Sequence, residues 1–238
     1  MINEVIALPV TFAGPLGSMV LNLSVIVGEE GVTLVDASMT TNEDGVVAAL
    51  EERGFAISDV RQIILTHQDI DHIGGLAELK RRSGAEAWAH AIEAPYIEGR
   101  ERLIKYPSEE RLTQNPGMRP IVEQIGYASI ERELADGELL DIAGGVRVIW
   151  TPGHTPGHIC LFHELTKTLI TGDAMTSSEG KLSGPNPGPT PDMPGAIESV
   201  KKLVGLGEID RIITYHGGVV TDDPRGQLLR VIAELTAA

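Results

Sequence analysis

The sequence predicts an α/β protein. Short apolar runs bounded by Gly, Pro and charged residues are typical of buried strands, and they alternate with segments whose apolar residues recur at helical spacing. Residues 63–65 and 209–214 are examples of such strands, and residues 43–53 and 225–236 are examples of such helices. The 238 residues suffice for a large core. We therefore expect one domain over residues 1–238.

The remaining elements follow from the same patterns. We expect further strands at residues 4–12, 20–27, 31–36, 85–89, 138–142, 146–150, 159–163 and 168–171, and further helices at residues 76–82 and 197–206. Gly and Pro residues predict a loop over Phe12–Met19 and a long loop over residues 183–195.

Residues 91–126 depart from this regular alternation. Charged side chains are mixed there with Pro95, Pro107, Pro116 and Pro120, which predicts a broken, helical insertion. An irregular insertion of this length either covers a site or makes a solvated excursion on the surface. The sequence favours neither alternative.

Charge and composition exclude several function classes. Lys+Arg 19 against Asp+Glu 34 gives a net charge of −15, which opposes binding to nucleic acid or to an anionic membrane. We expect neither a signal peptide nor a membrane span, and so a cytoplasmic location. The single cysteine, Cys160, lies in an apolar run and is expected to be a buried strand residue rather than a reactive thiol.

One stretch concentrates residues that can bind a metal. His67, Asp69, Asp71 and His72 fall within six positions, between the apolar run 63–65 and the start of a helix. Clustered carboxylates repel one another unless cations offset their charge. The stretch therefore predicts a metal site, provided that the rest of the chain supplies the missing ligands.

Three further candidates follow other predicted strands. His154 comes after the strand 146–150, Asp173 after the strand 168–171 and His216 after the strand 209–214. Loops meet at strand ends, so these side chains are expected to gather with the first four. The other histidines are interpreted differently: His90 and His163 as exposed, and His158 as a hydrogen-bonding neighbour of the site.

These motifs, taken in order, resemble the metallo-β-lactamase-fold hydrolases. The resemblance rests on His67-x-Asp69-x-Asp71-His72, Gly153-His154, Gly172-Asp173 and His216-Gly217, and together with the hairpin near residue 35 it covers most of the chain. It implies a four-layer αββα sandwich with a dinuclear metal centre at one edge of its β layers. A homodimer is an expectation from the same resemblance.

The resemblance also implies which residues bind which metal. One metal would take His67, Asp69 and His154, the other would take Asp71, His72 and His216, and Asp173 would bridge the two. Asp69 departs from the family, which has His at this position. With two divalent ions and a bridging hydroxide the charges sum to +4 − 3 − 1 = 0, against +1 for the His version. Zinc is the expected metal, with tolerance for Mn or Fe, and a one-metal protein is the alternative.

The implied reaction is hydrolysis by a metal-bridging hydroxide, with Asp71 receiving and returning a proton. The sequence shows no Gly-x-Ser-x-Gly nucleophile elbow. A lactone or carboxylic ester is the preferred small-molecule substrate, because apolar residues of the two predicted loops (Phe12, Leu16, Met19 and Met193) could form an apolar rim. Those loops could equally be plain connections.

Other functions remain open. A thioester hydrolase similar to glyoxalase II would need a basic patch, which the sequence does not clearly show. Phosphotriesterase and β-lactamase activities are further alternatives, with Lys105 or Lys181 as lone candidates to hold a phosphate. An iron-dependent redox enzyme and a non-catalytic metal-binding protein are alternatives from other classes.

Overall fold

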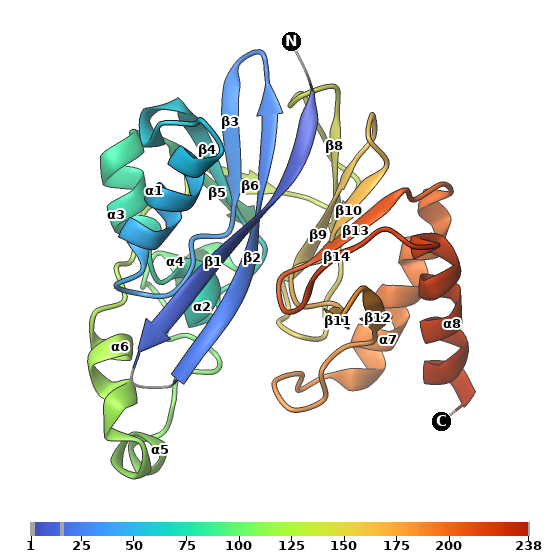
Figure 1. Ribbon diagram of the computed structural model, residues 1–238. Helices are drawn as coiled ribbons and strands as arrows, with labels where there is room; N and C mark the ends of the chain where they lie inside the picture. Colours follow the sequence, from blue (N-terminus) through green and yellow to red (C-terminus); the bar gives the residue numbers. More distant parts are fainter. Residues whose placement is uncertain (1–2, 15–16, 238) are drawn as a thin grey trace.

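The chain folds into two six-stranded sheets that pack face to face, with helices on both outer faces (Figure 1). This computed structural model describes residues 3–14 and 17–237. The order of layers is helix, sheet, sheet, helix. It is the four-layer αββα sandwich of the metallo-β-lactamase fold, which confirms the fold expected from the sequence.

The first sheet begins antiparallel and continues parallel. Its strands, in spatial order, are β1 (Glu4–Gly14), β2 (Gly17–Gly28), β3 (Gly31–Val35), β4 (Val60–Leu65), β5 (Glu86–His90) and β6 (Arg132–Leu134). Strands β1, β2 and β3 pair antiparallel, and β3 to β6 pair parallel. The parallel strands all end at the same edge of the sheet, which brings the loops after β3, β4 and β5 together.

The second sheet is mostly antiparallel. Its strands, in spatial order, are β14 (Gly218–Val220), β13 (Arg211–Thr214), β10 (Thr168–Ile170), β9 (Ile159–His163), β8 (Val146–Trp150) and β7 (Leu139–Leu140). Strands β10 and β13 are the parallel pair. A separate hairpin joins β11 (Thr176–Ser178) to β12 (Lys181–Ser183).

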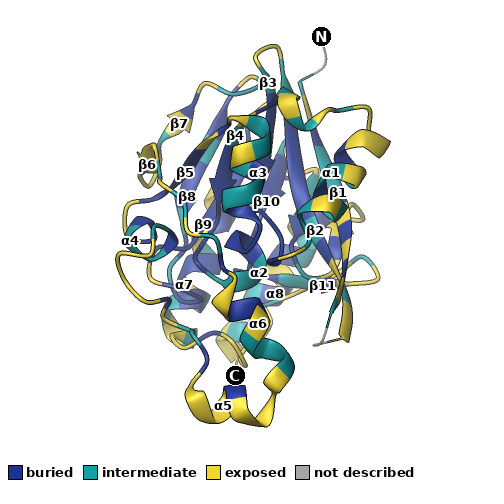
Figure 2. Ribbon diagram, turned by 90° about the vertical axis from the view of Figure 1, so that its left-hand side faces the viewer, coloured by how far each residue is buried: buried dark blue, intermediate teal, exposed yellow. Residues whose placement is uncertain are grey.

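Apolar side chains fill the space between the sheets. Val35 and Ile64 of the first sheet and Val148, Leu161 and Ile213 of the second belong to one buried cluster. Each sheet buries its other face under helices, and Figure 2 shows the strands buried beneath them. Strands buried on both faces read as continuous apolar runs, which explains why the runs in the sequence identify them.

Amphipathic helices form the outer layers. Those on the first sheet are α1 (Glu43–Glu52) and α3 (Leu76–Ser83), and those on the second are α7 (Met193–Lys202), η3 (Leu203–Leu206) and α8 (Pro224–Ala237). In α3, Leu76 and Leu79 are buried while the basic residues of its last turn stay near solvent. The helices expected from the 3.6-residue spacing are therefore present.

The segment 91–126 is helical but broken, as predicted. It contains α4 (Ala94–Ile97), α5 (Glu109–Gln114), η2 (Pro116–Met118) and α6 (Arg119–Glu123). Leu112, Ile121 and Val122 are buried against the rest of the protein, whereas the far side of α5 is exposed (Figure 2).

The prediction of a loop over Phe12–Met19 is wrong for those of its residues that the structure describes. Phe12 pairs with Met19 and Gly14 with Gly17, so β1 and β2 form one long hairpin; Pro15 and Leu16 lie outside the described residues. Phe12 is 3% exposed and belongs to the core, so it forms no rim for a substrate. Long antiparallel pairing here overrides the local preference of Gly and Pro for loops.

The sequence also missed several short elements. Strands β6, β11, β12 and β14 have three residues each, too few for a period-two pattern to stand out. Helix α7 begins at Met193 rather than at 197, because the Asp192 side chain accepts a hydrogen bond from the Gly195 amide and caps it there. The predicted loop over 183–195 is shorter at both ends. None of the helices within residues 3–14 and 17–237 is long and apolar enough to cross a membrane.

Candidate metal centre

Seven side chains meet at the edge of the sheets where the short helix α2 (Ile70–Ile73) lies (Figure 1). They form two groups, whose members each offer a metal-binding atom within 4.8 Å of the others: His67, Asp69, His154 and Asp173 in the first group, and Asp71, His72 and His216 in the second. All seven candidates from the sequence are therefore brought together.

The turn between β4 and α2 places four of these side chains. Strand β4 ends at Leu65 and α2 begins at Ile70, so His67 and Asp69 lie in the connection and Asp71 and His72 on the helix. Gly74 allows this turn to pack closely, since a Cβ there would lie 2.1 Å from the Thr40 amide nitrogen. A larger residue would push α2 away from the site.

The other three come from the second sheet. His154 follows β8, Asp173 follows β10 and His216 follows β13. Strands β10 and β13 are parallel neighbours, so their carboxyl ends deliver Asp173 and His216 to the same edge. Each of the three candidate ligands therefore lies at this edge because it follows an apolar strand.

The first group has the dimensions of a metal site. The Asp69 Oδ2 atom lies 3.4 Å from His67 Nε2 and 3.0 Å from His154 Nε2, and Asp173 Oδ2 lies 3.3 Å from His154 Nε2. A tetrahedral zinc with bonds of about 2.0–2.1 Å separates its ligand atoms by about 3.3–3.4 Å. The donor atoms therefore stand at the separations that one ion would hold.

The second group adjoins the first through Asp173. His216 Nε2 lies 3.2 Å from Asp71 Oδ2, and His72 Nε2 lies 3.9 Å from the same oxygen. Asp173 Oδ1 is 3.3 Å from His72 Nε2, while Asp173 Oδ2 is 3.5 Å from His216 Nε2. With one oxygen near His154 and the other near His72, Asp173 has the geometry of a bridging ligand.

Three buried polar atoms support this assignment. Within the described residues, His67 Nε2, His72 Nε2 and Asp173 Oδ1 have no hydrogen-bond partner. Buried polar atoms are nearly always satisfied, so atoms without a partner within these two groups indicate that a bound group belongs there. The donor set fits a divalent metal ion.

Asp36 orients the second group and was not assigned from the sequence. Its Oδ2 lies 2.9 Å from His72 Nδ1, and its Oδ1 accepts a hydrogen bond of 2.8 Å from the Thr66 amide. A carboxylate behind a ligand histidine holds the ring in place. Asp36 follows strand β3, so the rule that found His154 could also have found it.

Tyr215 supports the same group from another side. Its ring lies 3.8 Å from the His72 ring, and its hydroxyl donates a hydrogen bond to the Asp71 carbonyl oxygen. Burial, followed by the nearby Asp71 carboxylate, raises the pKa of the Tyr215 hydroxyl well above its usual value. The hydroxyl therefore stays protonated and acts as a donor.

Several contacts to the first group come from neutral partners. His154 Nδ1 lies 3.2 Å from Thr190 Oγ1, which belongs to the loop of residues 184–192, called the Pro-rich loop below. His67 Nδ1 lies 3.0 Å from Thr66 Oγ1. His158 Nε2 accepts a hydrogen bond of 3.0 Å from the Asp173 amide, which confirms its predicted place beside the site. These contacts position the ligands without adding charge.

Glu93 is a second residue that the sequence did not reveal. It is fully buried and accepts hydrogen bonds from the Gln68 amide and side chain, at 3.0 and 2.9 Å, and from the Gly157 amide at 2.6 Å. It thereby joins the turn of His67 to the turn of His154. Its place at the start of an irregular segment offered no periodic signal.

Two histidines predicted as exposed are buried. His90 stacks on Trp150 with ring centres 5.9 Å apart, and His163 Nε2 lies 2.7 Å from the Ala143 carbonyl oxygen. Neither belongs to the ligand groups. Cys160 is buried as predicted, and burial raises the pKa of its thiol to about 12, so it is unreactive.

The two groups differ in protonation when no metal is bound. Burial, followed by the neighbouring His72, lowers the pKa of His67 to about 4. Burial acts the same way on His216, but hydrogen bonds with Asp173 and Asp71 outweigh it and raise its pKa to about 10. Burial also opposes the charged form of His72, yet Asp36 and Asp173 outweigh it and raise the pKa of that ring as well. The second group therefore carries protons that a metal would displace.

Two cavities open beside the centre. One, of about 200 Å³, is lined by Asp69, Asp71 and Asp173 together with Asn186 and Pro189 of the Pro-rich loop. The other, of about 170 Å³, lies between the same turn and the segment 91–126. The insertion thus borders the centre rather than making a remote excursion.

Comparison with known proteins agrees with this geometry. Residues 19–216 match the model of the metallo-beta-lactamase superfamily. A metallo-beta-lactamase family protein from Thermus thermophilus superposes with a TM-score of 0.74 and 26% identity, covering 98% of this chain and 79% of that one.

Curated relatives carry the names of hydrolases. The probable metallo-hydrolase YflN of Bacillus subtilis is 30% identical over 77% of this chain and 74% of its own. The hydroxyacylglutathione hydrolase GloC of Haemophilus influenzae is 29% identical over 68% and 71%, and an N-acyl homoserine lactonase of a Bacillus species is 30% identical over 74% and 63%. The chain belongs to the metallo-beta-lactamase superfamily.

Proposed function

We propose that the protein is a metal-dependent hydrolase of a lactone or carboxylic ester. The observation that carries the proposal is the position of Asp173 between two ligand groups that open on one cavity. Two ions, zinc by preference and Mn or Fe as substitutes, fit the two groups of His and Asp ligands.

Bound metal ions would lower the pKa of a water molecule and polarise the substrate carbonyl. Asp71 is placed to handle the proton. Its side chain is 24% exposed, lines the cavity and lies 3.2 Å from His216. A carboxylate at this position can accept a proton from the attacking water and return it to the leaving group.

The second cavity supports an ester with an apolar acyl part. Ile70, Leu103, Pro107 and Met118 line it, directly beside Asp69 and Asp71. An acyl chain lying there would bring its carbonyl to the ligand groups. The relative named as an N-acyl homoserine lactonase is consistent with this substrate class.

One observation favours a second candidate, thioester hydrolysis. Lys105 and Arg111 line the same cavity and supply positive charge that an anionic thioester would need. The relative named as a hydroxyacylglutathione hydrolase points the same way. The two candidates differ in whether the substrate must carry a negative group.

A substrate screen tests the proposal. Protein loaded separately with Zn, Mn and Fe is assayed on lactones, aryl esters, glutathione thioesters, phosphotriesters and β-lactams. We expect the highest kcat/KM for a lactone or ester with an apolar acyl chain. Turnover of thioesters alone would replace the preferred substrate class by the second candidate, and no turnover of any compound would reject the hypothesis of an enzyme.

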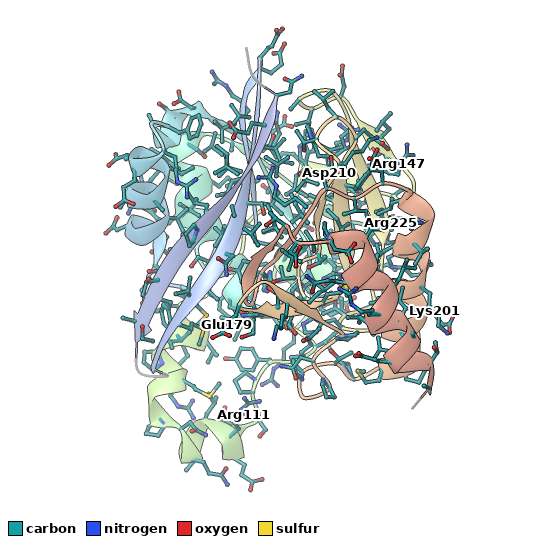
Figure 3. The ribbon with its side chains drawn as sticks, turned by 45° about the vertical axis from the view of Figure 1, so that its right-hand side comes forward. Arg111, Arg147, Glu179, Lys201, Asp210 and Arg225 are labelled. Atoms are coloured by element: carbon teal, nitrogen blue, oxygen red, sulfur yellow. The ribbon has the colours of Figure 1, made fainter. Side chains whose placement is uncertain are left out.

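Replacing Asp71 tests its role as proton acceptor. Asp71→Asn should lower kcat by about 10²–10⁴, the usual contribution of general acid–base catalysis. Asp210→Asn is the matched control, because Asp210 (labelled in Figure 3) is exposed and precedes β13, at the opposite end of that strand from His216. Unchanged turnover in Asp71→Asn would show that the proton goes elsewhere.

A further inference from the structure

Lys105 reaches into the first ligand group. Its Nζ atom lies 2.6 Å from Asp69 Oδ2 and 2.7 Å from His154 Nε2. Both acceptors are atoms that a metal in this group would use. The side chain is 23% exposed, so most of it is enclosed by the site.

The backbone around Lys105 is tied to the metal-binding turn. The Ile104 amide donates a hydrogen bond of 2.7 Å to Gln68 Oε1, and Gln68 itself donates to Glu93 through its amide and its side chain. Gln68 stands between His67 and Asp69 in the sequence. The segment 91–126 is therefore fastened to the ligand turn one residue before Lys105, which fixes where the ammonium group arrives.

A metal and this ammonium group cannot both use His154. A neutral imidazole has one nitrogen that accepts, with a single lone pair. In the contact described, the Lys105 ammonium takes the lone pair of His154 Nε2. A metal bound to the same nitrogen would require Lys105 to leave, and repulsion between the two cations acts in the same direction.

The second ligand group has no equivalent cation. Among the described residues, Asp71 and Asp173 form ion pairs with histidines and with no lysine or arginine. The two groups therefore offer a metal unequal sites, although each contributes two histidines and one terminal aspartate.

We propose that Lys105 is a built-in competitor of the metal in the first group. Metal then enters the group of His67, Asp69 and His154 only by displacing Lys105, whereas in the group of Asp71, His72 and His216 it displaces protons and no lysine or arginine from the described part of the chain. The adjoining cavity of about 170 Å³, which Lys105 itself lines, leaves room for the displaced side chain. The inference rests on the metal centre proposed above but not on the substrate.

Metal titration with variants of Lys105 tests it. Metal-free protein is titrated with Zn²⁺ against a chelator and with Co²⁺ by visible absorption. We expect the wild type to bind two ions in two separate steps. In Lys105→Met, which keeps the length of the chain and removes the charge, the step that fills the first group should tighten about ten- to hundredfold, since two charge-assisted hydrogen bonds no longer oppose it.

Two further variants isolate the charge. Lys105→Gln should tighten the same step, whereas Lys105→Arg should leave it weak because the cation is retained. Lys201→Met is the matched control: Lys201 lies on α7 at the outer surface (Figure 3), where it pairs with Glu198. It should change neither step.

A first-group step that is unchanged or further weakened in both Lys105→Met and Lys105→Gln would overturn the inference, since Lys105 would then support the metal rather than compete with it. The titration involves no turnover. Two steps with the expected response, together with a failed ester screen, would therefore reject the proposed substrate and leave the role of Lys105 standing.

Discussion

The two halves of the metal centre use the same ligands in different surroundings. Each half has two histidines and one aspartate of its own, and Asp173 lies 3.3 Å from one histidine of each half. Behind His72 stands a second carboxylate, Asp36, whereas Thr190 stands behind His154. A cation, Lys105, contacts the first half. Asp69 therefore makes the two halves alike in their types of candidate ligand but not in what surrounds them.

This difference also explains how the fold accommodates Asp69. The family that the sequence motifs resemble has a histidine at this position. An aspartate there adds one negative charge to the centre. The pair of Asp69 and Lys105, 2.6 Å apart, carries no net charge, as a histidine would. Without a metal, the charge of Asp69 is thus balanced by a residue of the segment 91–126, 36 positions further along the chain.

Removing the shared ligand should have the largest effect on both halves. Asp173→Ala leaves each group one ligand short, so we expect both steps of metal binding to weaken by more than about hundredfold, beyond the loss usual for an outer partner. Chelator competition measures this, with Asp210→Ala as the exposed control. If one step kept its affinity, Asp173 would belong to a single site and would not bridge.

Removing the orienting carboxylate should affect one half. Asp36→Asn is expected to weaken the step that fills the second half about ten- to hundredfold, because His72 loses the group that fixes its ring. The matched change in the other half, Thr190→Val, removes a neutral hydrogen bond and should weaken the step that fills the first half only about fivefold. Equal effects of the two variants in the titration would contradict the contrast between the halves.

Raising the pH should favour the second half. The pKa of His216, at about 10 in the metal-free protein, lies above the ordinary value, so a metal must displace its proton at neutral pH. Binding at this group should strengthen by about tenfold per pH unit for each proton released, until pH approaches 10. His67, with a pKa of about 4, adds no such dependence above pH 5.

The same shift has a consequence for stability. A histidine whose pKa is raised on folding contributes stability that is present below its unfolded pKa and is lost as the pH rises through its folded pKa. Metal-free protein should therefore lose this contribution of His216 between about pH 6.5 and pH 10. Thermal melts of wild type and His216→Gln across this range measure it. If the stability of the wild type relative to His216→Gln increased with pH, the result would contradict this prediction.

The spacing of apolar residues correctly predicted those strands and helices that depend on neighbouring residues of the chain. The strand before His67 and the helix of residues 43–53 follow from apolar spacing, and both are present as β4 and α1. Phe12 shows where such reasoning fails: nearby Gly and Pro suggested a loop, but pairing with β2 made it a core strand residue. The predictions for His90 and His163 failed similarly, since their burial depends on Trp150 of strand β8 and on Ala143 of the turn before it.

By itself the sequence determined the identity of the seven candidate ligands, because each follows an apolar strand and loops meet at strand ends. The resemblance implied how they divide into two groups. Tertiary structure alone decided how close the members of each group lie, how Asp36 stands behind His72, and how Lys105 enters the first group. Those contacts join residues 36 positions apart in the chain. No local pattern encodes such a distance, because it is set by packing of the two sheets and by the course of the segment 91–126.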